Sequence, residues 1–138
     1  MPEQIILLDI NISWIRLINN LNELYKFGDR KDSNVDQNWD KSNIIYRWVK
    51  HSNSEIAIIG ETNRKIKERV NNYTSATHNS HAGSTNKKVY EEQNRISANN
   101  DFLILEFTDQ VNGYNLNSDR ERKLAEKLLI GYTKPYLQ

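Results

Sequence analysis

Three apolar runs typical of β-strands stand out from the polar residues in the second half of this chain. Residues 43–49 and 55–60 are runs rich in β-branched and aromatic side chains, joined by a short polar stretch, which is the pattern of a β-hairpin. Residues 101–108 form a third run of the same kind. The three runs predict a small central antiparallel sheet.

Between the hairpin and the third strand, the apolar residues change to helical spacing. One predicted helix carries Ile66, Val70 and Tyr73 on a single face. A second and more polar helix is predicted over about 84–97, after a loop rich in Ser, Thr and Asn. The predicted order of elements is therefore β-β-α-α-β-α.

The last predicted helix has clear start and stop signals. The capping box Ser118-Asp-Arg-Glu121 precedes it, and Pro135 ends it. Its apolar residues fall at helical spacings and predict one buried face, made of Leu124, Leu128, Leu129 and Tyr132.

The first part of the chain is predicted to contain an amphipathic helix over 11–27. Its apolar stripe consists of Trp14, Ile15, Ile18, Leu21, Leu24 and Tyr25. Gly28 can end this helix, and a polar linker follows. We therefore divide the chain into an N-terminal helix with its linker, residues 1–41, and an α/β (α+β) domain, residues 42–138, in which helices flank a three-stranded sheet. We expect the first part to serve dimerisation, giving a homodimer, or DNA recognition.

Composition narrows the classes of protein that the chain can belong to. Its 138 residues, 37% hydrophobic and 27% charged, suffice for one folded core. The absence of Cys excludes disulfides and thiolate zinc sites. The apolar stretch Ile5–Leu8 is too short for a membrane anchor and lacks the basic residues of a signal peptide, so we expect a cytoplasmic protein with no membrane partner.

Two charged residues lie at the apolar side of predicted helices. Arg69 can use its fork of donors to hold a phosphate, although covering apolar surface or pairing with Glu68 explains its position equally well. Glu126 can hold a hard cation at the edge of the buried face, although an exposed ion pair with Arg122 accounts for the same spacing. Taken alone, both patterns favour the structural explanation.

Short motifs recur at the predicted strands and helices. Ile44-Ile45-Tyr46 lies on the first strand and Ile58-Ile59-Gly60 on the second. Arg69 follows Gly60 by nine residues, and Tyr73 comes four residues later. The last helix carries Glu126-Lys-Leu-Leu129-Ile130, which Pro135 and Gln138 follow.

In motif order and spacing, residues 42–138 resemble the GIY-YIG nuclease family. The two strand motifs correspond to the family's Gly-Ile-Tyr and Tyr-Ile-Gly, and the segment from Glu126 to Gln138 corresponds to its closing motif of Glu, Leu-Ile, Pro and Asn. The stretch Thr85–Val89 also resembles one found in restriction-type members. The resemblance implies a metal-dependent endonuclease, of a restriction or defence type, that hydrolyses phosphodiester bonds in double-stranded DNA.

The resemblance also implies a role for individual residues. Glu126 would bind Mg²⁺ or Mn²⁺, and Arg69 would hold the non-bridging phosphate oxygens. Tyr46 would orient or deprotonate the attacking water, while Tyr73 would donate a hydrogen bond to the phosphate. Gln138 keeps the amide with which the family's Asn can brace the site.

One departure from the family pattern puts the activity in question. Ile58 replaces the second motif tyrosine, and isoleucine cannot accept a proton. Three alternatives follow: Tyr46 acts alone, Tyr73, His78 or His81 substitutes for the missing tyrosine, or catalysis is weakened or lost. In the last case the chain would be a DNA-binding module on the same fold.

Basic residues cluster on the predicted helices near this site, although the net charge is only +1. They predict a DNA-binding groove made of Arg64, Lys65, Lys67, Lys87, Lys88 and Arg122. Acidic residues are interleaved with them, so solvated helix faces explain the same pattern. A protein-interaction domain with merely solubilising charges is the competing class.

Overall fold

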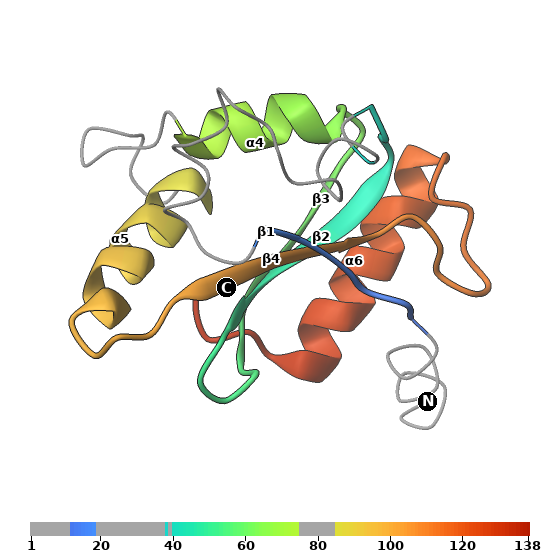
Figure 1. Ribbon diagram of the computed structural model, residues 1–138. Helices are drawn as coiled ribbons and strands as arrows, with labels where there is room; N and C mark the ends of the chain where they lie inside the picture. The colour runs from blue at the N-terminus through green and yellow to red at the C-terminus, as the bar shows by residue number, and fades with distance from the viewer. Residues whose placement is uncertain (1–11, 19–37, 39, 75–84) are drawn as a thin grey trace.

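A computed structural model of the protein describes residues 12–18, 38, 40–74 and 85–138 (Figure 1). Its centre is an antiparallel sheet in the order β1-β4-β2-β3, built from β1 (Ile15–Ile18), β2 (Ile44–Lys50), β3 (Ile56–Thr62) and β4 (Leu103–Thr108). The described helices are α4 (Ile66–Thr74), α5 (Thr85–Ser97) and α6 (Asp119–Thr133). None of the helices in these ranges is long and apolar enough to cross a membrane.

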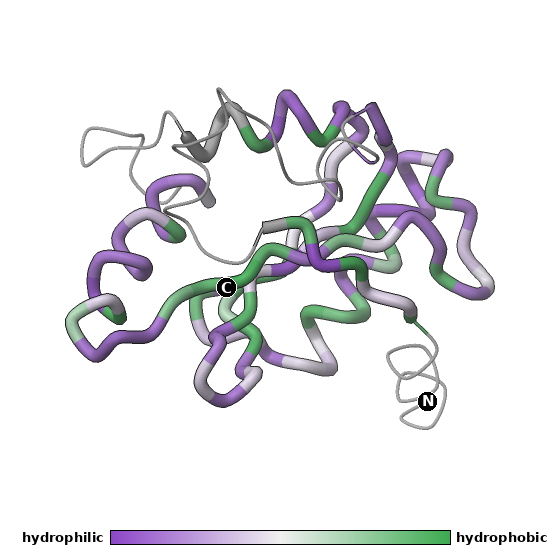
Figure 2. Tube along the Cα trace, in the orientation of Figure 1, coloured by the Kyte–Doolittle hydropathy of each residue, from purple (hydrophilic) through white to green (hydrophobic). Residues whose placement is uncertain are grey.

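The sheet separates two apolar cores. Figure 1 shows α4 and α5 over one face and α6 against the other. The first core joins the sheet to α4 and α5 and includes Tyr46, Trp48, Ile66, Val70, Val89 and Ile96. The second joins it to α6 and includes Ile45, Ile59, Ala125 and Leu129. Hydropathy follows this layering, with apolar strands between helices whose outer sides are polar (Figure 2).

The hairpin, the two middle helices and the last strand lie where the sequence predicts them. β2 and β3 pair antiparallel through a tight polar turn, in which Ser54 has a positive φ of 60° and donates its N–H to the Lys50 carbonyl oxygen at 3.0 Å. Ser118 caps α6 by accepting a hydrogen bond from the N–H of Glu121 at 3.3 Å. The mixed fold with an antiparallel sheet flanked by helices is thus confirmed.

Two predictions about the sheet and the first segment are wrong. The sheet has four strands and not three, because residues 15–18 form β1, inside the region predicted as an amphipathic helix. Ile15 and Leu17 pack into the first core while Arg16 between them is exposed, which is strand periodicity. In so short a segment the apolar spacing fits both structures, and pairing with β4 decides the outcome.

Helix α6 is rotated from its predicted orientation. Leu124 and Tyr132, expected on the buried face, are 44% and 39% exposed. The buried residues are Arg122, Ala125 and Leu129, and Leu128 packs partly buried against the second core, so the prediction holds for Leu128 and Leu129 only. Ala125 lets the helix lie close to the sheet, and Arg122 is buried because polar partners surround it.

The C-terminal tail runs along the outer edge of β3. The backbone N–H groups of Tyr136 and Leu137 donate to carbonyl oxygens of β3 at 3.2 and 2.8 Å. The tail is also held from α5, where the Tyr136 hydroxyl donates to the buried carboxylate of Glu92. Burial and this bond raise the pKa of Tyr136, so the hydroxyl keeps its proton.

Candidate active site

A surface pocket of about 390 Å³ opens beside the end of β3. It is lined by Tyr46, Ile59, Gly60, Glu61, Thr62, Arg64, Arg69, Thr85, Glu126 and Gln138. These residues come from β2, β3, α4, α5, α6 and the C-terminal tail. The pocket therefore brings together candidate site residues that lie up to 92 positions apart in the sequence, from Tyr46 to Gln138.

Tyr46 and Gly60 form the floor of this pocket and lie opposite each other on β2 and β3. The phenol ring of Tyr46 lies directly over Gly60. A Cβ atom at Gly60 would come within 2.3 Å of both Cζ and the hydroxyl oxygen of Tyr46, far below van der Waals contact. The glycine is therefore needed for close approach, and it leaves the phenol oxygen at the pocket.

Replacing Gly60 by Ala is expected to push the Tyr46 ring out of its place. The resulting overpacking should lower the free energy of unfolding by about 1–3 kcal/mol, measured by urea denaturation. Gly131→Ala is the matched control, because nothing lies within 4 Å of a Cβ at that exposed helical position. It should raise stability by about 0.5–1 kcal/mol. Equal effects at the two glycines would contradict the close contact.

Arg69 is fixed beside Tyr46 by three hydrogen bonds. Its Nε and Nη2 donate to the Tyr46 hydroxyl oxygen at 3.2 and 3.0 Å. Its Nη1 donates to Oδ1 of Asn86, at the start of α5, at 2.7 Å. The guanidinium carbon also lies 5.3 Å from the centroid of the Tyr46 ring, within the range of a cation–π contact. The positively charged guanidinium of Arg69 is thus held in a fixed orientation next to the Tyr46 phenol.

Glu126 enters the pocket from α6, on the other side of β3. Burial raises the pKa of its carboxyl, and the negative charge of Glu61 raises it further, while a hydrogen bond from the Glu61 backbone N–H works in the opposite direction. The ionised form of this carboxylate is therefore destabilised in the folded protein. Binding a cation would relieve that cost, so the carboxylate suits a hard metal ion.

Gln138 closes the pocket at the end of the tail. Its side chain makes both hydrogen bonds that a neighbouring strand would make with Ile59: it accepts from the Ile59 N–H at 2.9 Å and donates to the Ile59 carbonyl oxygen at 3.1 Å. The next outward N–H of β3, that of Glu61, donates to Glu126. Gln138 and Glu126 therefore bond to Ile59 and Glu61, two successive outward-facing residues on the edge of β3.

Arg122 lies inside the protein, behind the pocket, with 1% of its surface exposed. Its Nε donates to the Glu61 carboxylate at 2.6 Å, and its Nη1 donates to Asn43 Oδ1 at 3.0 Å and to the Leu116 carbonyl oxygen at 2.9 Å. Its Nη2 donates to Asp119. Arg122 is thus not on the basic surface where the sequence placed it, and its acidic partners are Glu61 and Asp119, not Glu126.

Ile58 is buried in the first core, opposite Trp48, and does not line the pocket. The side chain at the position of the missing motif tyrosine is therefore part of the apolar core. Tyr73 belongs to α4, but its side chain lies outside the described residues, as do His78 and His81. Within the described ranges, no three His, Asp or Glu residues come close enough to hold a metal among themselves.

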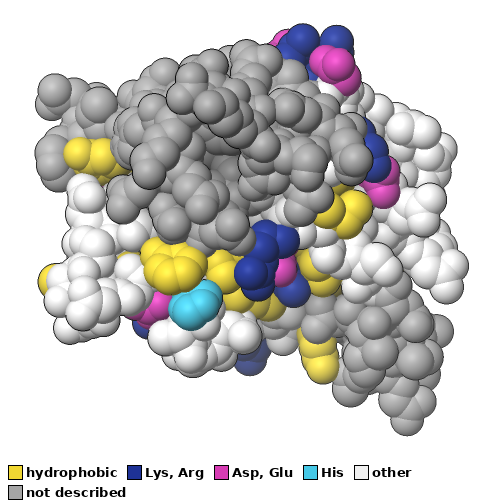
Figure 3. Space-filling view, in the orientation of Figure 1, with side chains coloured by type: hydrophobic (Ala, Val, Ile, Leu, Met, Phe, Trp, Pro, Cys, Tyr) yellow, Lys and Arg dark blue, Asp and Glu magenta, His cyan; other side chains and the backbone are white. Residues whose placement is uncertain are grey.

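The predicted basic groove is divided between the pocket and salt-bridged surface. Arg64 is exposed and lines the pocket. Lys65 and Lys67 share Asp40 at 3.7 and 3.2 Å, and Lys87 lies 3.8 Å from a carboxylate oxygen of Glu91. Lys88 is partly buried on α5. On the described part of the face in Figure 3, basic side chains gather in small groups with acidic neighbours and form no continuous patch.

Several residues of the pocket were not singled out from the sequence. Asn86, which lies beside the pocket and holds Arg69 from α5, is 17 positions further along the sequence, and only the resemblance of the stretch Thr85–Val89 pointed to it. Glu61 and Thr62 line the pocket because they end β3. Comparison of the chain with models of known protein families, with curated proteins and with solved structures finds no significant match.

Proposed function

We propose that the protein is a metal-dependent endonuclease that hydrolyses phosphodiester bonds in double-stranded DNA. The observation that supports this function is the meeting of a phenol, a guanidinium and a partly buried carboxylate, those of Tyr46, Arg69 and Glu126, in one pocket. Phosphodiester hydrolysis requires an activated water, a positive group for the phosphate oxygens and a stabilised leaving oxygen. Each requirement has a residue of the right chemistry in the pocket.

The guanidinium of Arg69 is the group suited to the phosphate. Its contacts with Tyr46 and Asn86 fix the plane of the fork before any substrate arrives, so little side-chain entropy is lost on binding. The Tyr46 hydroxyl, held next to that fork, is placed to orient or deprotonate a water near the same phosphate. Ile58 packs in the first core, and the proposal gives this role to Tyr46 without the second motif tyrosine.

Glu126 would hold Mg²⁺ or Mn²⁺, with water and substrate oxygens as the remaining ligands. The bound metal would neutralise charge on the phosphate and the leaving oxygen. The carboxylate is suited to this because a hydrogen bond from the Glu61 N–H orients it, and the charges of Lys123 and Lys127 offset the effect of burial on its pKa only in part. Because the motifs of residues 42–138 resemble those of GIY-YIG nucleases, we propose that the protein is a restriction or defence endonuclease.

Supercoiled plasmid should be nicked or cut by the protein with Mg²⁺ or Mn²⁺ and left intact with EDTA. Arg69→Ala should lower the cleavage rate by roughly 10²-fold or more, since it removes the charged donor pair of the site. The rate is measured from the loss of supercoiled DNA. Arg16→Ala, which changes an exposed arginine on β1, is the control and should cleave like the wild type.

Other outcomes separate the competing classes. Absence of cleavage with salt-sensitive DNA binding would favour the catalytically silent DNA-binding module. Equal cleavage by wild type and Arg69→Ala would point to a contaminating nuclease or to a different site. Absence of both cleavage and binding at low salt would refute the nuclease proposal and leave a protein-interaction domain.

A further inference from the structure

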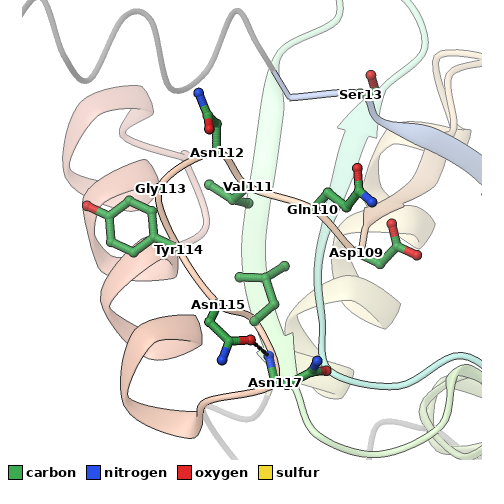
Figure 4. A pocket seen from close by; sticks show the side chains of 10 residues that line it. Ser13, Asp109, Gln110, Val111, Asn112, Gly113, Tyr114, Asn115 and Asn117 are labelled. Carbon is green, nitrogen blue, oxygen red and sulfur yellow. Dashed lines mark hydrogen bonds between the residues drawn. The ribbon is translucent and has the colours of Figure 1, made fainter.

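A second pocket, of about 430 Å³, lies in the loop that joins β4 to α6. Its wall carries four amide side chains within eight residues, those of Gln110, Asn112, Asn115 and Asn117. Figure 4 shows these side chains spread along the loop, with the hydrogen bond between Asn115 and Asn117 at its lower end. The pocket is mainly lined by uncharged polar groups, and its acidic residue, Asp109, forms an ion pair with Lys41 at 3.2 Å.

The loop that carries these amides has a fixed conformation. Val111 and Leu116 anchor it in the second core, and the Tyr114 N–H donates to the Val111 carbonyl oxygen at 3.0 Å. Between these two residues, Gly113 has a φ of 88° and makes the tight turn. The Asn115 N–H donates to the Glu121 carboxylate at 3.1 Å, which ties the loop to the first turn of α6.

Two of the amides are available to a partner. Gln110 and Asn112 are exposed, and within the described part of the chain their side chains make no hydrogen bond. Each carboxamide presents a donor and an acceptor side by side. This pair matches the major-groove edge of adenine, where N6–H donates to the carboxamide oxygen and N7 accepts from the carboxamide N–H.

The loop lies level with the candidate active site. On β2, Ile45 pairs with Thr108 on one side and with Glu61 on the other, so the ends of β4 and β3 are separated only by β2. Neighbouring strands are about 4.8 Å apart, which puts the two strand ends about 10 Å apart, less than the roughly 12 Å width of the major groove. One DNA duplex can therefore reach both.

A continuous set of hydrogen bonds also joins the two sites. Arg122 donates to the Leu116 carbonyl oxygen in the loop and to the Glu61 carboxylate at the pocket. Asn43 bridges in the same way, because it donates to Asn117 at 3.2 Å and accepts from Arg122. The end of the loop at Leu116 and Asn117 is thereby tied to Glu61, which lines the first pocket.

We propose that Gln110 and Asn112 read base edges in the major groove of the DNA held at the candidate active site, with a preference for adenine. The proposal rests on the proposed nuclease function and names the surface that gives it sequence preference. Contacts to phosphate position a protein on DNA, whereas contacts to base edges specify sequence. The pocket at Tyr46 and Arg69 supplies the first kind, and the amide loop supplies the second.

The test is a binding selection with a random duplex library in EDTA, so that no cleavage is needed. The wild type should enrich sites with a defined adenine, and the double variant Gln110→Ala/Asn112→Ala should lose that enrichment. Its ratio of affinities for the selected and a scrambled duplex should fall by roughly 5- to 150-fold. Affinity for the scrambled duplex and its salt dependence should stay unchanged.

Asn94→Ala/Asn99→Ala is the matched control, because it removes two exposed amides at the other end of the sheet, on α5 and in the turn after it. This control should select like the wild type. The proposal is overturned if the loop variant keeps the wild-type preference, if it weakens binding to all duplexes equally, or if the wild type binds DNA without preference. In these three cases nuclease function can still hold, whereas absence of any DNA binding refutes both.

Discussion

Glu126→Gln should abolish metal-dependent DNA cleavage while making the folded protein more stable at neutral pH. The amide still accepts the hydrogen bond from the Glu61 N–H, so the local geometry is kept. It carries no charge and is a poor ligand for Mg²⁺ or Mn²⁺. A catalytic metal supplies several kcal/mol of charge stabilisation, so the cleavage rate should fall about a thousandfold or more.

The gain in stability has a definite pH dependence. Burial raises the pKa of Glu126 above its ordinary value of 4.5, so the folded protein binds this proton more tightly than the unfolded chain does. The stability that the protonated carboxyl contributes is present at acid pH and is lost as the pH rises through the raised pKa. Glutamine does not ionise. The free energy of unfolding of the variant should therefore exceed that of the wild type above about pH 4.5, and the difference should persist at pH 7.

Urea denaturation of both proteins in EDTA between pH 3 and 8 measures this difference. Glu91→Gln provides the control, because it changes an exposed carboxylate on α5 in the same way and should show no comparable gain. A wild-type protein that is as stable as Glu126→Gln at pH 7 would mean that Glu126 is not strained by burial, and cleavage by the variant would exclude it as the metal ligand.

Arg122→Ala should cause the largest loss of stability of any single change in α6. The substitution leaves the carboxylate of Glu61 and the carbonyl oxygen of Leu116 without their buried partner. Removing one member of a buried ion pair costs about 3–5 kcal/mol, and we expect the lower end of that range here, because the Glu61 side chain is 16% exposed. A protein of this size with typical stability of about 5–15 kcal/mol would be left close to unfolding.

Chemical denaturation followed by circular dichroism measures the effect. Lys123→Ala, one residue further along α6 and exposed, should change the free energy of unfolding by no more than about 0.5 kcal/mol. Arg122→Lys should recover only part of the loss, because lysine cannot reach Glu61, Asn43 and Asp119 together. A stable Arg122→Ala protein would contradict this prediction and show that water molecules hydrogen-bond to the former partners of Arg122.

Local patterns predicted the elements whose structure is decided locally. The hairpin and α6 follow from β-branched runs, a polar turn and the cap at Ser118, all within a few residues of one another. β1 could not be predicted in this way, because pairing with β4, some 90 positions later, decides between strand and helix. The rotation of α6 had the same cause, since the acid that allows Arg122 to be buried lies 61 positions away.

For the candidate site, motif spacing selected residues that the fold brings to one pocket. Tyr46, Gly60, Arg69, Glu126 and Gln138 were chosen from their order along the chain, and all line that pocket. The contacts that hold them in place were not visible in the sequence. In the sequence Asn86 is an ordinary polar residue, and only the packing of α5 beside α4 shows that it lies 2.7 Å from the Arg69 guanidinium.

The tail along β3 has a consequence for association between molecules. An open strand edge offers unpaired N–H and C=O groups to any other extended chain, which is a common route to aggregation and strand exchange. Here the backbone of Tyr136 and Leu137 and the amide of Gln138 occupy those groups from Ile56 to Ile59. Two copies of the protein cannot join their sheets through β3 while the tail is in place, so a homodimer would have to form through another surface.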